Sequence, residues 1–149
     1  MSGIVVSDST CLIALERIER LDLLPAMFAE IWIPPAVARE FGRPIPWLRV
    51  RAPLDVANVA RYDAAVDAGE AAAIALAKEL GCEVILDDRQ ARRLAADERV
   101  PCLGLLGLLL RAKAAGKLVA VRPDIEALAA HRFFISTPLV AEALRLAGE

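Results

Sequence analysis

The sequence has too few histidines and too little cysteine patterning for a zinc site. It contains one histidine, and its three cysteines form no Cys-x-x-Cys pair, whereas structural zinc is held by four such ligands at short spacings. An odd number of cysteines also argues against a disulfide framework. We therefore expect three buried, reduced thiols, as is usual in a cytoplasmic protein.

No segment is apolar for long enough to cross a membrane. The longest apolar run, Cys102–Leu110, is far shorter than the roughly 20 residues that a spanning helix needs. The opening residues Met1–Asp8 also lack the basic start and apolar stretch of a signal peptide. These absences predict a cytoplasmic protein with no membrane contact.

The chain has no basic excess. It carries 18 lysines and arginines against 20 acidic residues, for a formal net charge of −2. Proteins that hold nucleic acid mainly by charge usually carry a net positive charge, so a large nucleic-acid footprint is not expected. The balance still fits an enzyme whose acidic centre binds a metal ion while a local basic patch holds phosphate.

What the sequence does contain is the pattern of one α/β domain. Its 149 residues, 57% apolar and 26% charged, can bury a core without staples, and no repeat or linker divides residues 1–149. Apolar runs predict strands at Ile4–Ser7, Glu30–Ile33, Glu83–Leu86 and Val100–Leu103. Helical periodicity lies between them, at 12–24, 34–41, 55–67, 67–80, 89–98 and 105–115.

Alternation of strands and helices predicts an α/β fold, a three-layer α/β/α sandwich around a mainly parallel sheet. Further amphipathic helices at 124–130 and 139–146 would form a C-terminal segment, about 124–147, packed at the edge of the domain. The Leu105–Leu110 run is more apolar than one buried helix face needs, which favours a subunit interface there.

Two of the predicted strands end in acids. Asp8 follows the first strand, and Asp87 and Asp88 follow the strand at 83–86. In open α/β sheets ligands collect beyond the carboxyl ends of the strands, so these acids can share one site. Each could instead form a turn or cap a helix.

Two glutamates are candidates for the same crevice. Glu70 stands three residues after Asp67, as in a capping box, yet it also tops the apolar stripe of its helix. Glu40 lies in the last turn of the 34–41 helix, where the helix dipole disfavours an anion, on the same face as Val37 and Phe41. A solvated surface glutamate is the simpler alternative for Glu40.

Carboxylates gathered in one crevice repel one another unless a cation neutralises them. Oxygen ligands without histidine or thiolate suit Mg²⁺ or Mn²⁺, and such an ion can polarise a phosphoryl oxygen and activate water. Ser9 and Thr10 could bond the carboxylates or a phosphate, or merely cap a helix. Arg89, Arg92 and Arg93 share a helix face and could hold a phosphate backbone, or could pair with Asp97 and Glu98.

Four stretches together resemble the PIN-domain ribonucleases. They are Val6–Leu15 with its Asp-x-Ser/Thr motif, Ile33–Glu40, Asp67–Ala71 and Leu86–Arg89, in that order and within residues 4 to about 117. The chain looks most like the compact prokaryotic branch similar to VapC-type toxins.

The resemblance implies a metal-dependent ribonuclease. Its acids would be Asp8, Glu40, Glu70 and Asp87, with Asp88 a rival for the last place, and they would bind Mg²⁺ or Mn²⁺ and direct water at an RNA phosphodiester. Many PIN domains have aspartate where this chain has Glu70. The resemblance also implies a homodimer and a small antitoxin partner.

Other functions fit the residues less well. A haloacid-dehalogenase-like phosphatase needs a second aspartate where Thr10 stands, and a dinucleotide site needs glycines that Asp8–Ile13 lacks. A degenerate PIN fold kept as a binding or regulatory module stays open as the alternative, although none of the expected acids is missing.

Overall fold

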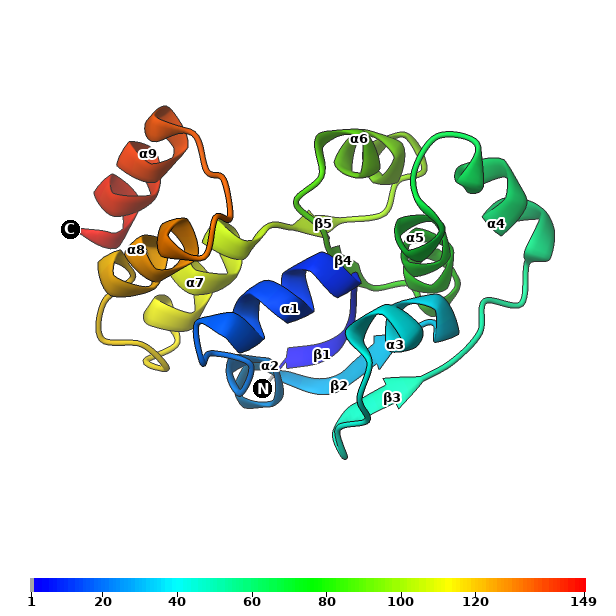
Figure 1. Cartoon of the computed structure of the whole chain (residues 1–149), viewed down its shortest axis with the longest axis horizontal. Helices are drawn as coiled ribbons and strands as arrows, with labels where there is room; N and C mark the ends of the chain where they lie inside the picture. The colour runs from blue at the N-terminus through cyan, green and yellow to red at the C-terminus, as the bar shows by residue number, and fades with distance from the viewer. Residues whose placement is uncertain (1) are drawn as a thin grey trace.

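The computed structural model describes residues 2–149, which form a parallel sheet between two layers of helices (Figure 1). The sheet order is β3-β2-β1-β4-β5, and every neighbouring pair is parallel. The strands are β1 (Ser2–Ser7), β2 (Phe28–Ile33), β3 (Leu48–Val50), β4 (Glu83–Ile85) and β5 (Cys102–Leu103). The predicted three-layer α/β/α fold is confirmed.

The helices follow the predicted order, with one break. They are α1 (Ser9–Arg17), α2 (Leu23–Met27), α3 (Pro35–Phe41), α4 (Val56–Asp63), α5 (Ala68–Leu80), α6 (Arg89–Asp97), α7 (Leu105–Ala114), α8 (Arg122–Ala130) and α9 (Thr137–Ala147). The single helix expected at 12–24 is wrong, because α1 ends at Arg17 and Glu19 takes a left-handed φ of 59°. Strand β3 was not predicted.

Alternation along the central strands assigns side chains to two cores. Val5 and Ile85 face the core that holds α1, α2, α7 and α8, whereas Val6 and Val84 face the core that holds α4, α5 and α6. This is the two-residue period of a strand buried on both faces. β1 and β4 are therefore covered by helices on each side, and only their ends can reach solvent.

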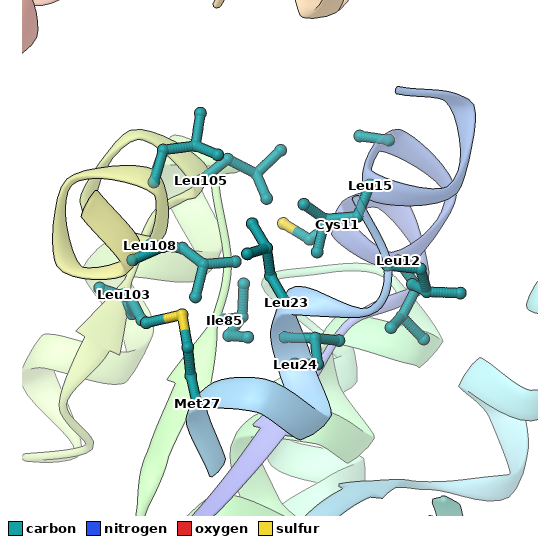
Figure 2. Packing of buried hydrophobic residues seen from close by; sticks show 14 of the residues in the cluster. Cys11, Leu12, Leu15, Leu23, Leu24, Met27, Ile85, Leu103, Leu105 and Leu108 are labelled. Atoms are coloured by element: carbon teal, nitrogen blue, oxygen red, sulfur yellow. The ribbon is translucent and has the colours of Figure 1, made fainter. Parts of the chain in front are cut away.

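The first core is built largely by leucines that converge from three helices (Figure 2). Leu12 and Leu15 from α1, Leu24 from α2, and Leu105 and Leu108 from α7 are all fully buried. Of the remaining leucines of the 105–110 run, Leu109 is also buried, and Leu106 and Leu110 are half-buried against the same core. Much of the apolar excess of this run is therefore satisfied within the chain.

The C-terminal helices gather at one end of the molecule, away from α4 (Figure 1). Arg20 Nε donates to both carboxylate oxygens of buried Asp124, at 2.9 and 3.1 Å, which ties α8 to the link between α1 and α2. The Glu149 carboxylate accepts from Lys113 Nζ at 2.9 Å and from the Val121 N–H at 2.8 Å. These bonds fix α8 and α9 against α7.

No helix within residues 2–149 is long and apolar enough to span a membrane.

Candidate active site

The acids at the ends of β1 and β4 lie at one edge of the sheet. The two strands are hydrogen-bonded neighbours, with Ser7 opposite Ile85. One step beyond, the Asp8 N–H donates to the Ile85 carbonyl at 3.2 Å, so the pairing continues to the point where the acids begin. Asp8 and Asp87 are thus brought to the same edge of the sheet, as parallel strand ends require.

Asp8 is the most buried acid at this edge of the sheet, with a relative exposure of 2%. It is the N-cap of α1, and its Oδ1 accepts the Cys11 N–H at 2.9 Å. Burial raises its pKa from 3.8 to about 6, and the negative charges of Asp87 and Asp67 add to the rise, while the Cys11 hydrogen bonds oppose it. A carboxylate held in this way favours a nearby cation.

Contacts from α7 and α1 orient the side chain of Asp87. Its Oδ2 accepts the Leu105 N–H at 2.9 Å, and the Cys11 Sγ lies 3.7 Å from the same oxygen. Arg92 Nη1 is 3.9 Å from Oδ1. Burial raises the pKa of Asp87, whereas the Leu105 bond and the Arg92 charge lower it.

Gly104 makes room for the contact between Asp87 and Arg92. A Cβ at position 104 would stand 2.5 Å from Arg92 Nη1 and 2.8 Å from Asp87 Oδ1. No side chain can occupy that space without displacing the guanidinium or the carboxylate. Gly104 is also the buried N-cap of α7.

Glu70 caps α5 and is buried near other acids. The capping box with Asp67 is present, the Glu70 N–H donating to Asp67 Oδ1 at 2.8 Å and the Asp67 N–H to Glu70 Oε1 at 3.3 Å. Glu70 is also buried. The pKa of Glu70 is raised to about 7, mainly by burial and next by the negative charge of Asp67. The charges of Asp88 and Asp8 raise it further.

Asp67 is the acid that sequence reasoning missed. It was given only a capping role, yet its charge raises the pKa of both Asp8 and Glu70, and its side chain is exposed. It therefore lies near Asp8 and Glu70 on the side that is open to solvent. Its position in the same short motif as Glu70 was the available signal.

Glu40 lies beside the first turn of α5. Its side chain is exposed, but its Oε1 lies against Gly69 and would overlap a Cβ built there. The same Cβ would be 3.6 Å from Asp67 Oδ1. Gly69 thus leaves room for the carboxylates of Glu40 and Asp67 beside the first turn of α5.

The doublet after β4 points in two directions. Asp88 is exposed and caps α6, its Oδ2 accepting the Ala91 N–H at 3.0 Å. Its charge acts on Glu70, whereas that of Asp87 acts on Asp8. Both aspartates remain candidates, Asp87 for the floor of the crevice and Asp88 for the side towards α5.

The donor set suits Mg²⁺ or Mn²⁺, although the site is not preassembled. Within residues 2–149 no three acid, histidine or cysteine side chains already stand in a metal-holding arrangement. Mg²⁺ commonly binds through only one or two carboxylates, keeps several waters, and takes further oxygens from a phosphate. The all-oxygen chemistry and mutual repulsion of these acids therefore fit such an ion.

The predicted substrate residues separate into two places. Ser9 is buried in the first turn of α1. Thr10 is exposed and lines a hollow of about 310 Å³ together with the end of α8, including His131. Arg89 and Arg92 line a different hollow, of about 760 Å³, that contains Asp87.

The proposed pairing of the α6 arginines with Glu98 is absent from the described structure. Glu98 instead accepts from the Tyr62 hydroxyl at 2.6 Å, from Lys78 at 2.9 Å and from Arg61 at 2.9 Å. These three donors hold the pKa of Glu98 well below its usual range. The carboxylate is therefore fully occupied on the far side of α6.

Fold and site together define a three-layer α/β protein with an acid cluster beyond the carboxyl ends of two parallel strands. A family model described as PIN domain, DUF3368, matches residues 4–149. The chain belongs to this PIN-domain family, whose fold is that of a nuclease. The match includes the C-terminal helices, beyond the residues that carried the resemblance. Comparisons with curated proteins and with solved structures returned no match.

Proposed function

We propose that the protein is a metal-dependent endoribonuclease, with residues 1–149 acting as one nuclease domain. The observation that carries this proposal is the buried Asp8 carboxylate. None of the ion pairs formed within residues 2–149 includes Asp8 or Glu70. Burying acids without a cationic partner costs stability, which a bound Mg²⁺ or Mn²⁺ would recover.

The chain's own residues divide the work by position. Asp8, Glu70 and Asp87 would hold the ion in the crevice, with Asp88 and Glu40 at its sides. When bound, the ion supplies polarisation of the phosphoryl oxygen and activation of water.

Neighbouring backbone groups keep the inner carboxylates oriented. The Cys11 N–H holds Asp8, and the Leu105 N–H holds Asp87. Ser9, Thr10, Arg89 and Arg92 are the candidates for contacts to the RNA phosphates.

A direct test is cleavage of RNA by the purified protein with Mg²⁺ or Mn²⁺ and with chelator. We expect cleavage only with metal, and we expect Asp8→Asn to abolish it. Asp22→Asn is the matched control, because Asp22 is exposed and its side chain makes no cap hydrogen bond. Metal-dependent cleavage by a pure Asp8→Asn preparation would refute the assignment. A single-stranded DNA of the same sequence tests the preference for RNA.

A catalytically degenerate PIN fold that binds or regulates is the second candidate. It is favoured by the engagement of Asp87 with Arg92 and by the lack of a preassembled metal cluster in the described residues. Titration with Mn²⁺ separates the two functions. A nuclease should be thermally stabilised by the ion and should cleave, whereas the binding module should show neither response.

The resemblance to VapC-type toxins also suggests a biological role. In this view the protein is the toxin of a toxin–antitoxin pair, a homodimer inhibited by a small antitoxin, acting in the cytoplasm. The three cysteines form no disulfide, which agrees with a reducing compartment. Expression of the wild type should arrest growth, and Asp8→Asn should not. Growth arrest by both proteins would contradict a toxin that acts through cleavage.

A further inference from the structure

A shallow hollow on α6 is lined by four arginines. Its volume is about 670 Å³, and Arg89, Arg92, Arg93 and Arg99 all border it. The first three stand at i, i+3 and i+4 and so share one helix face. Arg99 joins them from the turn after α6, where its φ of 60° reverses the chain and the Val100 N–H returns to the Ala95 carbonyl.

The positive charge in this hollow is not neutralised by the chain. Among residues 2–149, Arg89, Arg93 and Arg99 form no ion pair. Arg92 has one ion pair, with Asp87 at 3.9 Å, and its Nη1 also donates to the Leu86 carbonyl at 3.1 Å. The arginine side chains are exposed. In a chain of net charge −2, gathering like charges on one face costs energy that an external polyanion would recover.

A second hollow connects these arginines with the acid crevice. The 760 Å³ hollow shares Arg89 and Arg92 with the first and also contains Asp87. Its far wall is formed by the segment before α9, where the side chain of Phe134 is 87% exposed. Proteins that bind single strands combine a positively charged groove with aromatic side chains on which unpaired bases stack.

We propose that single-stranded nucleic acid crosses α6 with its phosphates on the four arginines and stacks a base on Phe134, which brings the intervening phosphate to Asp87. This inference deepens the proposed nuclease function and rests on it. A duplex would keep its bases paired and away from Phe134. An acidic protein partner could also cover the arginines, but it would leave the continuity with Asp87 without a purpose.

Fluorescence anisotropy with a labelled single-stranded RNA of about 12 nucleotides tests the path. Measurements use the Asp8→Asn background, in which the RNA should stay intact. Arg93→Ala/Arg99→Ala should weaken binding at least about tenfold and reduce the slope of log affinity against log salt by about 1.4, for two lost phosphate contacts. Phe134→Ala should weaken it roughly 5- to 150-fold without changing the slope.

The matched control is Arg51→Ala/Lys117→Ala, which removes the same charge from exposed positions that border neither hollow. Affinity of Arg93→Ala/Arg99→Ala equal to that of this control would overturn the arginine path, and an unaffected Phe134→Ala would overturn the stacking site. Equal affinity for a duplex, or binding of an acidic peptide but of no nucleic acid, would also overturn the proposal.

The binding and cleavage measurements distinguish a failure of the nucleic-acid path from a failure of the proposed nuclease function. Arginine-dependent RNA binding by a wild-type protein that never cleaves would support the path and remove the nuclease proposal. Metal-dependent cleavage that survives undiminished in Arg93→Ala/Arg99→Ala, with unchanged KM, would overturn the path and leave the nuclease proposal standing.

Discussion

Asp8→Asn should stabilise the metal-free protein at neutral pH. Burial raises the pKa of Asp8 from 3.8 to about 6, and each pH unit of that difference is worth about 1.36 kcal/mol. Keeping Asp8 ionised in the fold therefore costs about 3 kcal/mol. Asparagine removes the charge and can still cap α1 by accepting the Cys11 N–H.

The pH dependence has a defined sign. Below about pH 4 Asp8 is protonated in both states, and it contributes no penalty. Between about pH 4 and 6 the unfolded chain releases its proton first, so the free energy of unfolding of the wild type falls as pH rises. Above about pH 6 the penalty is complete, and the variant should exceed the wild type by up to about 3 kcal/mol.

Urea unfolding in the presence of a chelator, repeated between pH 3.5 and 7.5, measures this difference. Asp22→Asn makes the same chemical change at an exposed site and should leave the free energy of unfolding within about 0.5 kcal/mol. Added Mg²⁺ should stabilise the wild type and have little effect on Asp8→Asn. A variant less stable than the wild type at pH 7, or a gap that does not change with pH, would refute the reasoning.

Three further changes test the surroundings of the site. Gly69→Ala should lower metal-dependent cleavage about tenfold or more by displacing Glu40, yet hold or slightly raise the Tm, since alanine favours a helix by up to about 1 kcal/mol. Cleavage kinetics and thermal melting of Gly69→Ala, with Gly3→Ala as the control, measure both effects. Unchanged cleavage by Gly69→Ala would contradict the prediction. Tyr62→Phe should lower the free energy of unfolding in urea by about 1.5–3 kcal/mol, because a bond to a charged carboxylate is lost; no loss would show that the bond contributes nothing. Arg61, Tyr62 and Lys78 hold the pKa of Glu98 below its ordinary value of 4.5. The stabilisation that the Glu98 carboxylate contributes is therefore present above about pH 4.5 and is lost as the pH falls. Glu98→Gln should therefore lower the free energy of unfolding at pH 7 and weaken its decrease at acid pH. An unaltered dependence of the free energy of unfolding on pH would contradict this role of Glu98.

Local signals in the sequence were enough for most of the elements. The capping box at Asp67 and Glu70 and the left-handed Gly81 fixed both ends of α5, because these motifs depend only on residues a few positions apart. The break after Arg17 was missed. The leucines beyond it keep facing the core, so the apolar period continues while the backbone turns.

The edge strand β3 gave no usable pattern. It has three residues, Leu48–Val50, and only the first is buried. Such a strand is defined by its pairing with β2, where Leu48 lies opposite Ile31. A pattern that short is formed by hydrogen bonds to a distant segment and not by its own composition.

From the sequence alone, Asp8 and Asp87 each follow a strand of a parallel sheet, and the carboxyl ends of parallel strands share an edge. That the two strands are hydrogen-bonded neighbours, and how each carboxylate is oriented, follows from the folded structure. The position of Asp67 near Asp8 and Glu70, the approach of Glu40 to Gly69, and the grouping of Arg89 and Arg92 with Phe134 around one hollow all depend on packing between α3, α5, α6 and the segment before α9. Exposure and charge are properties of surfaces that the chain creates only when it folds, so no local spacing encodes them.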